Sequence, residues 1–325
     1  MKVRPAITAL VLPVLAALAA PADAQQITLR YKWMPGDVLI YRTTVRTNST
    51  VTGGPAGPVT YEQTLGQTLK VTVAAVAPDG TATVQQVIDA VTLDTNGPSG
   101  RMSYDSAKPP AGNADPRVLS VARTLGAMVG EPISVAIAPN GAIRRIDGAA
   151  RLVQKLMADL PRDPMAGGLA QNLKAMLSED ALRSSLEQSF SRLPDAPVKP
   201  GDTWTAEQSV GADVTGKVVS TSTFTLKAIE GAGDAAVARV AVALALTQPG
   251  APSGSASMAM RLTDGKGEGE LLFNIPGGRI QRNGMQSDIS STATMRGAEG
   301  TNTTVRNAAR TTMTMELVKW TSGAR

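Results

Sequence analysis

Apolar and polar residues alternate with a period of two over most of the chain. In residues 61–73 the odd-numbered positions are mostly apolar, and the even-numbered positions are mostly polar. Residues 240–246 and 305–317 show the same alternation, and Phe224, Leu226 and Ala228 continue one face of residues 214–230. This period is typical of antiparallel strands with one buried face. Turn sequences such as Pro78-Asp79-Gly80 and Asn96-Gly97 separate the strands, so the sequence predicts a mainly β fold.

Helical spacing replaces this alternation in two places. Asp115 is a predicted N-cap, Pro116 occupies the first helical position, and Gly130 can end the helix. Residues 149–193 predict two or three short helices. Their apolar positions form two stripes, one at Leu152, Leu156 and Leu160 and the other at Leu182, Leu186 and Phe190.

Two short motifs occur twice, in the same order. Pro35-Gly36-Asp37 recurs as Pro200-Gly201-Asp202, and the pattern x-Pro-x-Gly-x-Ile-x-Arg occurs at residues 138–145 and 275–282. In Pro-Gly-Asp the proline presets φ, the glycine supplies a positive φ, and the aspartate can bond nearby backbone amides. We therefore predict structural turns rather than a pair of catalytic aspartates, and we interpret the pattern as an internal duplication.

These patterns predict two tandem antiparallel-sheet repeats joined by a helical connector. The sheets could form a curved sheet, a half-barrel or a sandwich. The predicted division is a signal peptide at 1–24, a first β repeat with one helix at 25–148, the connector at 149–193 and a second β repeat at 194–325. Residues 107–132 have no counterpart in the second repeat.

The N-terminus has the three parts of a secretory signal peptide. Lys2 and Arg4 precede an uncharged apolar run at residues 6–20, and Ala22-Asp23-Ala24 provides small residues for signal peptidase. The run is shorter than the roughly 20 residues that span a bilayer. We predict cleavage before Gln25, with the protein periplasmic or secreted and without a transmembrane helix afterwards.

Composition excludes several kinds of chemistry. The chain has 0 His and 0 Cys, which removes the usual general base, thiol nucleophiles and thiolate metal sites. Its net charge of +5 is spread thinly, with no Lys/Arg run longer than two, so we predict no nucleic-acid partner. No nucleophile or phosphate-binding motif is present. The sequence predicts a non-enzymatic protein with no cofactor, no metal site and no catalytic residues, whose core consists of aliphatic residues because aromatics make up only 3%.

Two further features invite a functional interpretation. Gly265-Lys-Gly-Glu-Gly269 is predicted to be a flexible loop before a strand. Methionines at i, i+2 spacing share one face of a strand, and they either fill the core or form an adaptable wall for an apolar ligand. A copper(I) site would require further ligands from a facing strand. The candidate wall residues are Met258, Met260, Met313 and Met315.

The motifs at Pro35–Tyr41, Pro200–Trp204 and Pro276–Ile280 carry a resemblance to a bacterial family of exported proteins and lipoproteins with no assigned function. The resemblance covers most of residues 27–320 and implies no catalytic residues. Many members carry a lipobox, which this cysteine-free chain lacks. By fold analogy the chain is also similar to the curved half-barrels of periplasmic lipoprotein and lipid carriers. We expect a cell-envelope protein of unknown partners that binds or interacts, with a carrier of lipid or another apolar ligand as the alternative.

Overall fold

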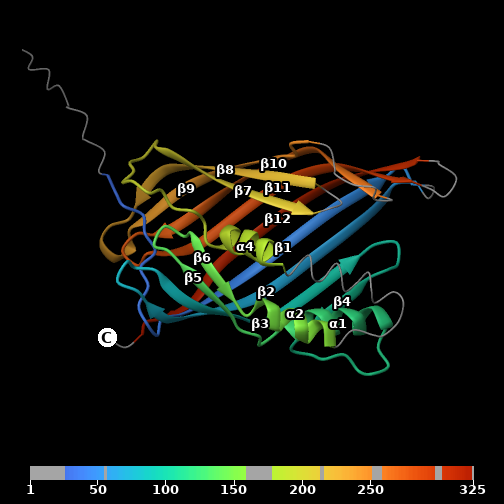
Figure 1. Ribbon diagram of the computed structural model, residues 1–325, viewed down its shortest axis with the longest axis horizontal. Coiled ribbons are helices and arrows are strands. Elements are labelled where there is room, and N and C mark those ends of the chain that lie inside the picture. Colours follow the sequence, from blue (N-terminus) through green and yellow to red (C-terminus); the bar gives the residue numbers. More distant parts are fainter. Residues whose placement is uncertain are drawn as a thin grey trace, which may run out of the picture.

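The computed structural model describes residues 26–54, 57–158, 178–212, 216–250, 258–296 and 302–323, so the predicted signal peptide lies outside the described residues. Within these residues, twelve strands form one antiparallel sheet (Figure 1). The mainly β prediction is therefore confirmed. The strands are β1 (Val38–Thr52), β2 (Val59–Val76), β3 (Ala82–Asn96), β4 (Met102–Asp105), β5 (Ile133–Ile137), β6 (Ile143–Asp147), β7 (Thr203–Ala212), β8 (Gly216–Glu230), β9 (Val237–Thr247), β10 (Met258–Asn274), β11 (Arg279–Arg296) and β12 (Asn302–Thr321).

The two halves of the chain lie in one continuous sheet rather than in two separate sheets. The strand order is β6-β5-β3-β2-β1-β12-β11-β10-β9-β8-β7, with β4 paired to β3. Strand β12 pairs with β1 on one side and β11 on the other, so the last strand joins the two halves. Along this order the strand numbers decrease from β6 to β1 and again from β12 to β7. The strands of both halves are therefore arranged in the same direction across the sheet.

The two Pro-Gly-Asp turns make matching hydrogen bonds. Gly36 and Gly201 have φ angles of 85° and 98°, which glycine adopts without strain. The Gly36 amide donates to the Val73 carbonyl at 2.8 Å, and the Gly201 amide donates to the Leu226 carbonyl at the same distance. In each turn the aspartate carboxylate also accepts a backbone N–H three residues earlier. The duplication and its boundaries at residues 148 and 193 stay a prediction.

The sheet is strongly curved, and its two edges approach each other across a helix. The edge strands β6 and β7 both contact α4 (Glu179–Ser189), which lies on the concave side (Figure 1). The Arg183 guanidinium donates to the Ile143 carbonyl at 2.7 Å, which ties α4 to β6. In α4 the predicted apolar stripe is confirmed, because Leu186 and Phe190 are buried and Leu182 packs beside them.

The other helices occupy the concave side of the first half. Helix α1 (Pro116–Met128) begins at Asp115, whose carboxylate accepts the Arg117 amide at 2.8 Å, so the predicted N-cap is confirmed. Apolar residues of α1 pack against β3 and β4 around Val91, Leu93 and Tyr104. Helix α2 (Ala149–Ala158) follows β6 and buries Leu152. The predicted stripe residue Leu160 and the side chain of Leu156 lie outside the described residues.

Most buried hydrophobic residues are aliphatic, as we expected, but the core also holds an aromatic cluster. Four aromatic residues gather where the N-terminal segment, the end of α4 and β10 meet. Tyr31 stacks on Trp33 with ring centroids 5.4 Å apart and meets Phe190 and Phe273 edge to face. Composition alone does not show that seven aromatic residues are buried, namely Tyr31, Trp33, Tyr41, Tyr104, Phe190, Phe224 and Phe273.

An extended N-terminal segment, residues 27–34, lies between the two Pro-x-Gly turns. The Tyr31 amide donates to the Pro139 carbonyl at 2.8 Å, and the Lys32 amide donates to the Gly278 carbonyl at 3.1 Å. Ile27 forms a bridge with Val198. This segment therefore links the β5–β6 turn, the β10–β11 turn and the chain leading to β7.

Candidate functional site

A cavity of about 700 Å³ lies on the concave side of the second half of the sheet. It is bounded by the inner faces of β1, β12, β11, β9, β8 and β7, by the end of α4 and by residues 190–195. Known small-molecule sites have volumes of about 300–1,000 Å³. In the first half, α1 packs against β3 and β4 around Val91, Leu93 and Tyr104.

The inner wall is built from transverse rows of residues on neighbouring strands. Register partners across an antiparallel pair share one face of the sheet. Met313 is paired with Met285, Val242 with Phe224, and Phe224 with Trp204, and all five residues line the cavity. This row is apolar throughout. The next row lies two residues further along each strand, away from the hydrophobic core, and mixes apolar and small polar residues. Its members are Thr311, Ser287, Leu244, Ser222 and Ala206.

Burial decreases along each strand, which defines an inner and an outer end of the cavity. On β9 the inward-facing side chains change from fully buried Val240, through Val242 at 5% exposure, to half-buried Leu244 and Leu246. The inner end of the cavity therefore adjoins the hydrophobic core, and the outer end lies where the strands become more exposed.

Three glycines of β10 face the same side as the cavity wall. Gly269 is the register partner of Met285 on one side and Val242 on the other, and both partners face the cavity. Gly265 and Gly267 lie at every second position before it and therefore share this concave face. The predicted loop at 265–269 was therefore wrong, because these residues lie inside a strand. A β-carbon on Gly267 would stand 2.7 Å from the Gln286 carbonyl oxygen, so a side chain has no room there.

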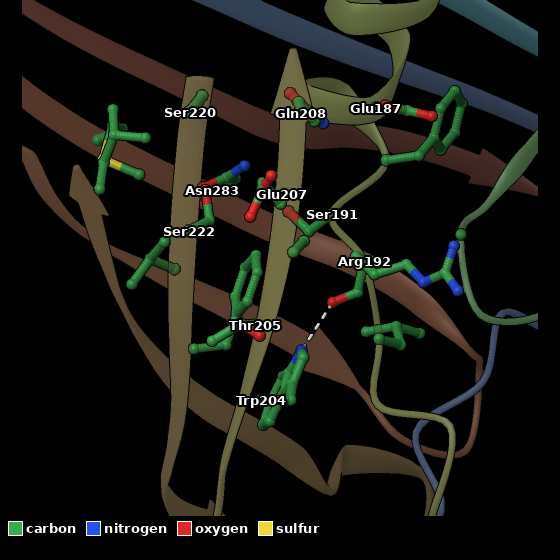
Figure 2. A pocket seen from close by; sticks show the side chains of 18 of the residues that line it. Glu187, Ser191, Arg192, Trp204, Thr205, Glu207, Gln208, Ser220, Ser222 and Asn283 are labelled. Atoms are coloured by element: carbon green, nitrogen blue, oxygen red, sulfur yellow. Dashed lines mark hydrogen bonds between the residues drawn. The ribbon is translucent and has the colours of Figure 1, made fainter. Parts of the chain in front are cut away.

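The 190–195 segment, Phe190 to Asp195, covers the inner part of the cavity and is fastened from three sides. The Trp204 indole N–H donates to the Arg192 carbonyl at 2.8 Å, a bond drawn in Figure 2. The Leu193 amide donates to the Asn140 carbonyl at 3.0 Å. The Tyr31 hydroxyl donates to the Ser191 carbonyl at 3.3 Å. The segment is thus held to β7, to the β5–β6 turn and to the N-terminal segment.

Two buried polar side chains line the cavity without a protein partner. Asn283 of β11 is 5% exposed and Ser191 is 6% exposed, and Figure 2 shows both among the lining side chains. No hydrogen bond of the Asn283 amide or the Ser191 hydroxyl occurs among the described residues, and their polar atoms keep contact with the cavity space. These two groups can therefore hydrogen-bond to a ligand held in the cavity.

The charged lining residues carry more negative than positive charge. Glu187, Asp195 and Glu207 are carboxylates, and Arg192 is the one cation among the described residues that line the cavity. The Asn140 amide donates to Asp195 at 2.6 Å and holds the pKa of that carboxyl below its usual value, with a smaller contribution from the Arg192 charge. Asp195 therefore stays ionised near neutral pH.

The predicted methionine wall is only partly gathered at the cavity. Met313 lines it, whereas Met315 lies one row further in and is buried in the core. Met260 is paired with Ala293, several positions further towards the rim, and the Met258 side chain lies outside the described residues. The assignment of these four residues to a ligand wall stays a prediction.

Sequence reasoning missed Met285, Asn283 and the aromatic pair of Trp204 and Phe224, which stack with centroids 5.5 Å apart. The even spacing of Asn283, Met285, Ser287 and Ile289 on β11 would have placed them on one face. No local signal would have shown that this face borders a cavity.

The described residues give no support to metal or membrane-helix assignments. No group of three or more His, Cys, Asp or Glu that could hold a metal ion occurs among them. No helix in the described ranges is long and apolar enough to cross a membrane.

The fold and the cavity define a class: an open, curved antiparallel sheet with a partly apolar pocket on its concave side. The chain belongs to a family of unknown function, DUF6263, whose model matches residues 79–280. This family has no assigned function, which confirms part of the resemblance described above. The export of this chain stays a proposal. A comparison of the sequence with curated proteins gives no match.

Three solved structures are similar to parts or all of the chain at low identity. A lipovitellin structure on lipid–protein interactions has a TM-score of 0.47 at 12% identity over 90% of this chain, which spans 26% of the lipovitellin chain. DynF, from the dynemicin biosynthesis pathway of Micromonospora chersina, has a TM-score of 0.19 at 8% identity, covering 90% and 85% of the two chains. An outer membrane channel from Pseudomonas putida F1 has a TM-score of 0.20 at 9% identity, covering 90% and 99%.

Proposed function

We propose that this protein is an exported, non-enzymatic binding protein that holds an apolar or amphipathic small molecule in its concave cavity. The observation that supports this proposal is the cavity of about 700 Å³, whose inner wall carries the row Met313, Met285, Val242, Phe224 and Trp204. Burying the apolar part of a ligand against this wall would contribute about 25 cal/mol per Å². A filled concave side would have favoured a protein that acts only through its outer surface.

The proposed export rests on the N-terminal sequence. Lys2, Arg4, the apolar run at 6–20 and Ala22-Asp23-Ala24 match a cleaved signal peptide. N-terminal sequencing of protein recovered outside the cytoplasm is expected to begin at Gln25. Recovery of the uncleaved chain in a membrane fraction would contradict export as a soluble mature protein.

Binding is tested with the uncharged apolar dye Nile red and a pair of matched variants. Ser222 faces the cavity on β8, whereas Ala243 on the neighbouring strand is exposed on the opposite face. We expect the wild-type protein to bind Nile red saturably. Ser222→Trp should abolish this binding by filling the cavity, and Ala243→Trp should leave it unchanged.

Circular dichroism spectra of both variants check that the sheet is retained. If the wild-type protein shows no saturable dye binding, the ligand-carrier function is wrong, and an envelope protein that interacts through its surface becomes the better account. Equal loss of binding in both variants would place the dye outside the cavity and would also contradict the proposal.

A further inference from the structure

The cavity combines an apolar middle with unpartnered polar groups at its inner end. Asn283 lies in the row that contains Met315 and Leu271, next to the hydrophobic core, and one row further in than Met285. Ser191 reaches the cavity from the covering segment. Asn283 therefore lies deeper than the apolar row that contains Met285, which is the reverse of a site that leaves a polar head at its mouth.

We propose that the ligand is an uncharged amphipathic molecule that enters with its polar end first. Its hydroxyl, ester or amide group bonds the Asn283 amide and the Ser191 hydroxyl, and its hydrocarbon part lies against the outer rows. This inference rests on the proposed binding function and specifies the ligand class for the same cavity.

Hydrogen bonding requires a polar group at the inner end. The Asn283 amide has two N–H donors and a carbonyl acceptor. The residue is 5% exposed, and no hydrogen bond to its amide occurs among the described residues. A ligand with only hydrocarbon at this end would leave both Asn283 and Ser191 unpaired. A ligand hydroxyl or carbonyl satisfies them and gains affinity of about 3- to 10-fold per hydrogen bond.

Electrostatics disfavour an anionic head at either end of the cavity. Among the described lining residues, no buried cationic side chain accompanies Asn283 and Ser191, so a carboxylate or phosphate there would be desolvated without a counter-charge. The half-buried and exposed lining residues that the structure describes carry three carboxylates and the guanidinium of Arg192, which is within 3.8 Å of Asp195. An uncharged head is therefore preferred over that of a fatty acid or phospholipid.

A series of dodecyl probes that differ only in the head group tests this preference. Dodecanol, dodecanoate and dodecylphosphocholine are each titrated into the purified protein with bound Nile red at pH 8. Dodecanol is kept below its aqueous solubility, and the other two are kept below their micellar concentrations. We expect dodecanol to displace the dye at least 10-fold more tightly than dodecanoate, because each factor of ten corresponds to about 1.4 kcal/mol and desolvating an unpaired charge costs more than that. Equal or tighter binding of dodecanoate or dodecylphosphocholine overturns the inference.

The polar-end assignment is tested with Asn283→Leu and the control Asn48→Leu, which replaces an exposed asparagine on β1. Asn283→Leu should weaken dodecanol binding about 3- to 10-fold relative to that variant's own affinity for Nile red. Asn48→Leu should leave dodecanol binding unchanged. Unchanged dodecanol affinity in Asn283→Leu contradicts the assignment, even when the wild-type head-group order is as expected.

The outcomes separate this inference from the function on which it rests. If wild-type protein does not bind Nile red at all, the binding function fails. If it binds the dye but ranks the heads in another order, only the inference fails. Should Asn283→Leu not fold, Ser191→Ala provides the second variant, with an expected 2- to 5-fold loss of dodecanol affinity for one neutral hydrogen bond.

Discussion

Phe190 is the residue whose replacement best tests how the cavity is closed. It follows the last turn of α4, is 5% exposed, and meets Tyr31 and Trp33 edge to face at ring-centroid distances of 6.2 and 6.3 Å. Replacing a buried phenylalanine with alanine costs about 3–5 kcal/mol, and lost aromatic pairs are included in that range. We expect Phe190→Ala to lower the free energy of unfolding by about 4 kcal/mol.

This loss is a large fraction of a typical total stability of about 5–15 kcal/mol. The variant should therefore fold at 20 °C but unfold at a much lower urea concentration. Because Phe190 begins the 190–195 segment, its loss should also loosen the cavity cover and weaken Nile red binding. Urea titrations followed by circular dichroism measure the first effect, and dye titrations measure the second.

The matched control is Tyr61→Ala, which removes an aromatic ring that is 46% exposed. Its expected cost is below about 1 kcal/mol, because substitutions at exposed positions have small effects. If Phe190→Ala destabilises the protein no more than Tyr61→Ala, the aromatic cluster does not hold the covering segment. The account of how the cavity is closed would then be wrong.

Three further predictions concern the core, the strand β10 and the two turns. Burial raises the pKa of Tyr31 and Tyr41, so their neutral forms stabilise the fold fully below about pH 10, the pKa of an exposed tyrosine. Above that pH the free energy of unfolding should fall by about 1.4 kcal/mol per pH unit for each residue. Urea titrations at pH 9–11.5 should show that this free energy falls less steeply with pH in Tyr41→Phe than in the wild type. Parallel pH dependences would contradict this expectation. Gly269→Ala should destabilise by about 1–3 kcal/mol in thermal melts, because its β-carbon would collide with the carbonyl oxygen of the paired strand; an unchanged melting temperature would count against the described packing. Asp37→Ala should cost more than Asp202→Ala in urea titrations, about 1–3 kcal/mol, because only Asp37 is buried and also accepts a backbone N–H from residue 323; the reverse order would refute the comparison.

The chain's local patterns were sufficient for the elements and for parts of their faces. Alternation at residues 305–317 predicts the inward face of β12, and Asp115-Pro116 predicts the start of α1, because strand periodicity and helix capping depend on residues close in sequence. The Gly-x-Gly-x-Gly segment was misread for the same reason. Glycine disfavours an isolated strand, and only the close backbone of β11 explains why Gly267 and Gly269 are required there.

By itself, the sequence determined a mainly β chain with short helices, no histidine or cysteine chemistry, and repeated turn motifs. Only the tertiary structure decided that the strands form one curved sheet, that α1 packs against β3 and β4, and that a cavity lies on the concave side of the second half. Asn283 shows the difference most clearly: its sequence neighbourhood is an ordinary polar stretch, yet in the fold it is buried beside apolar residues and faces the cavity. Contacts between residues far apart in the chain depend on sheet curvature and strand order, which no local pattern encodes.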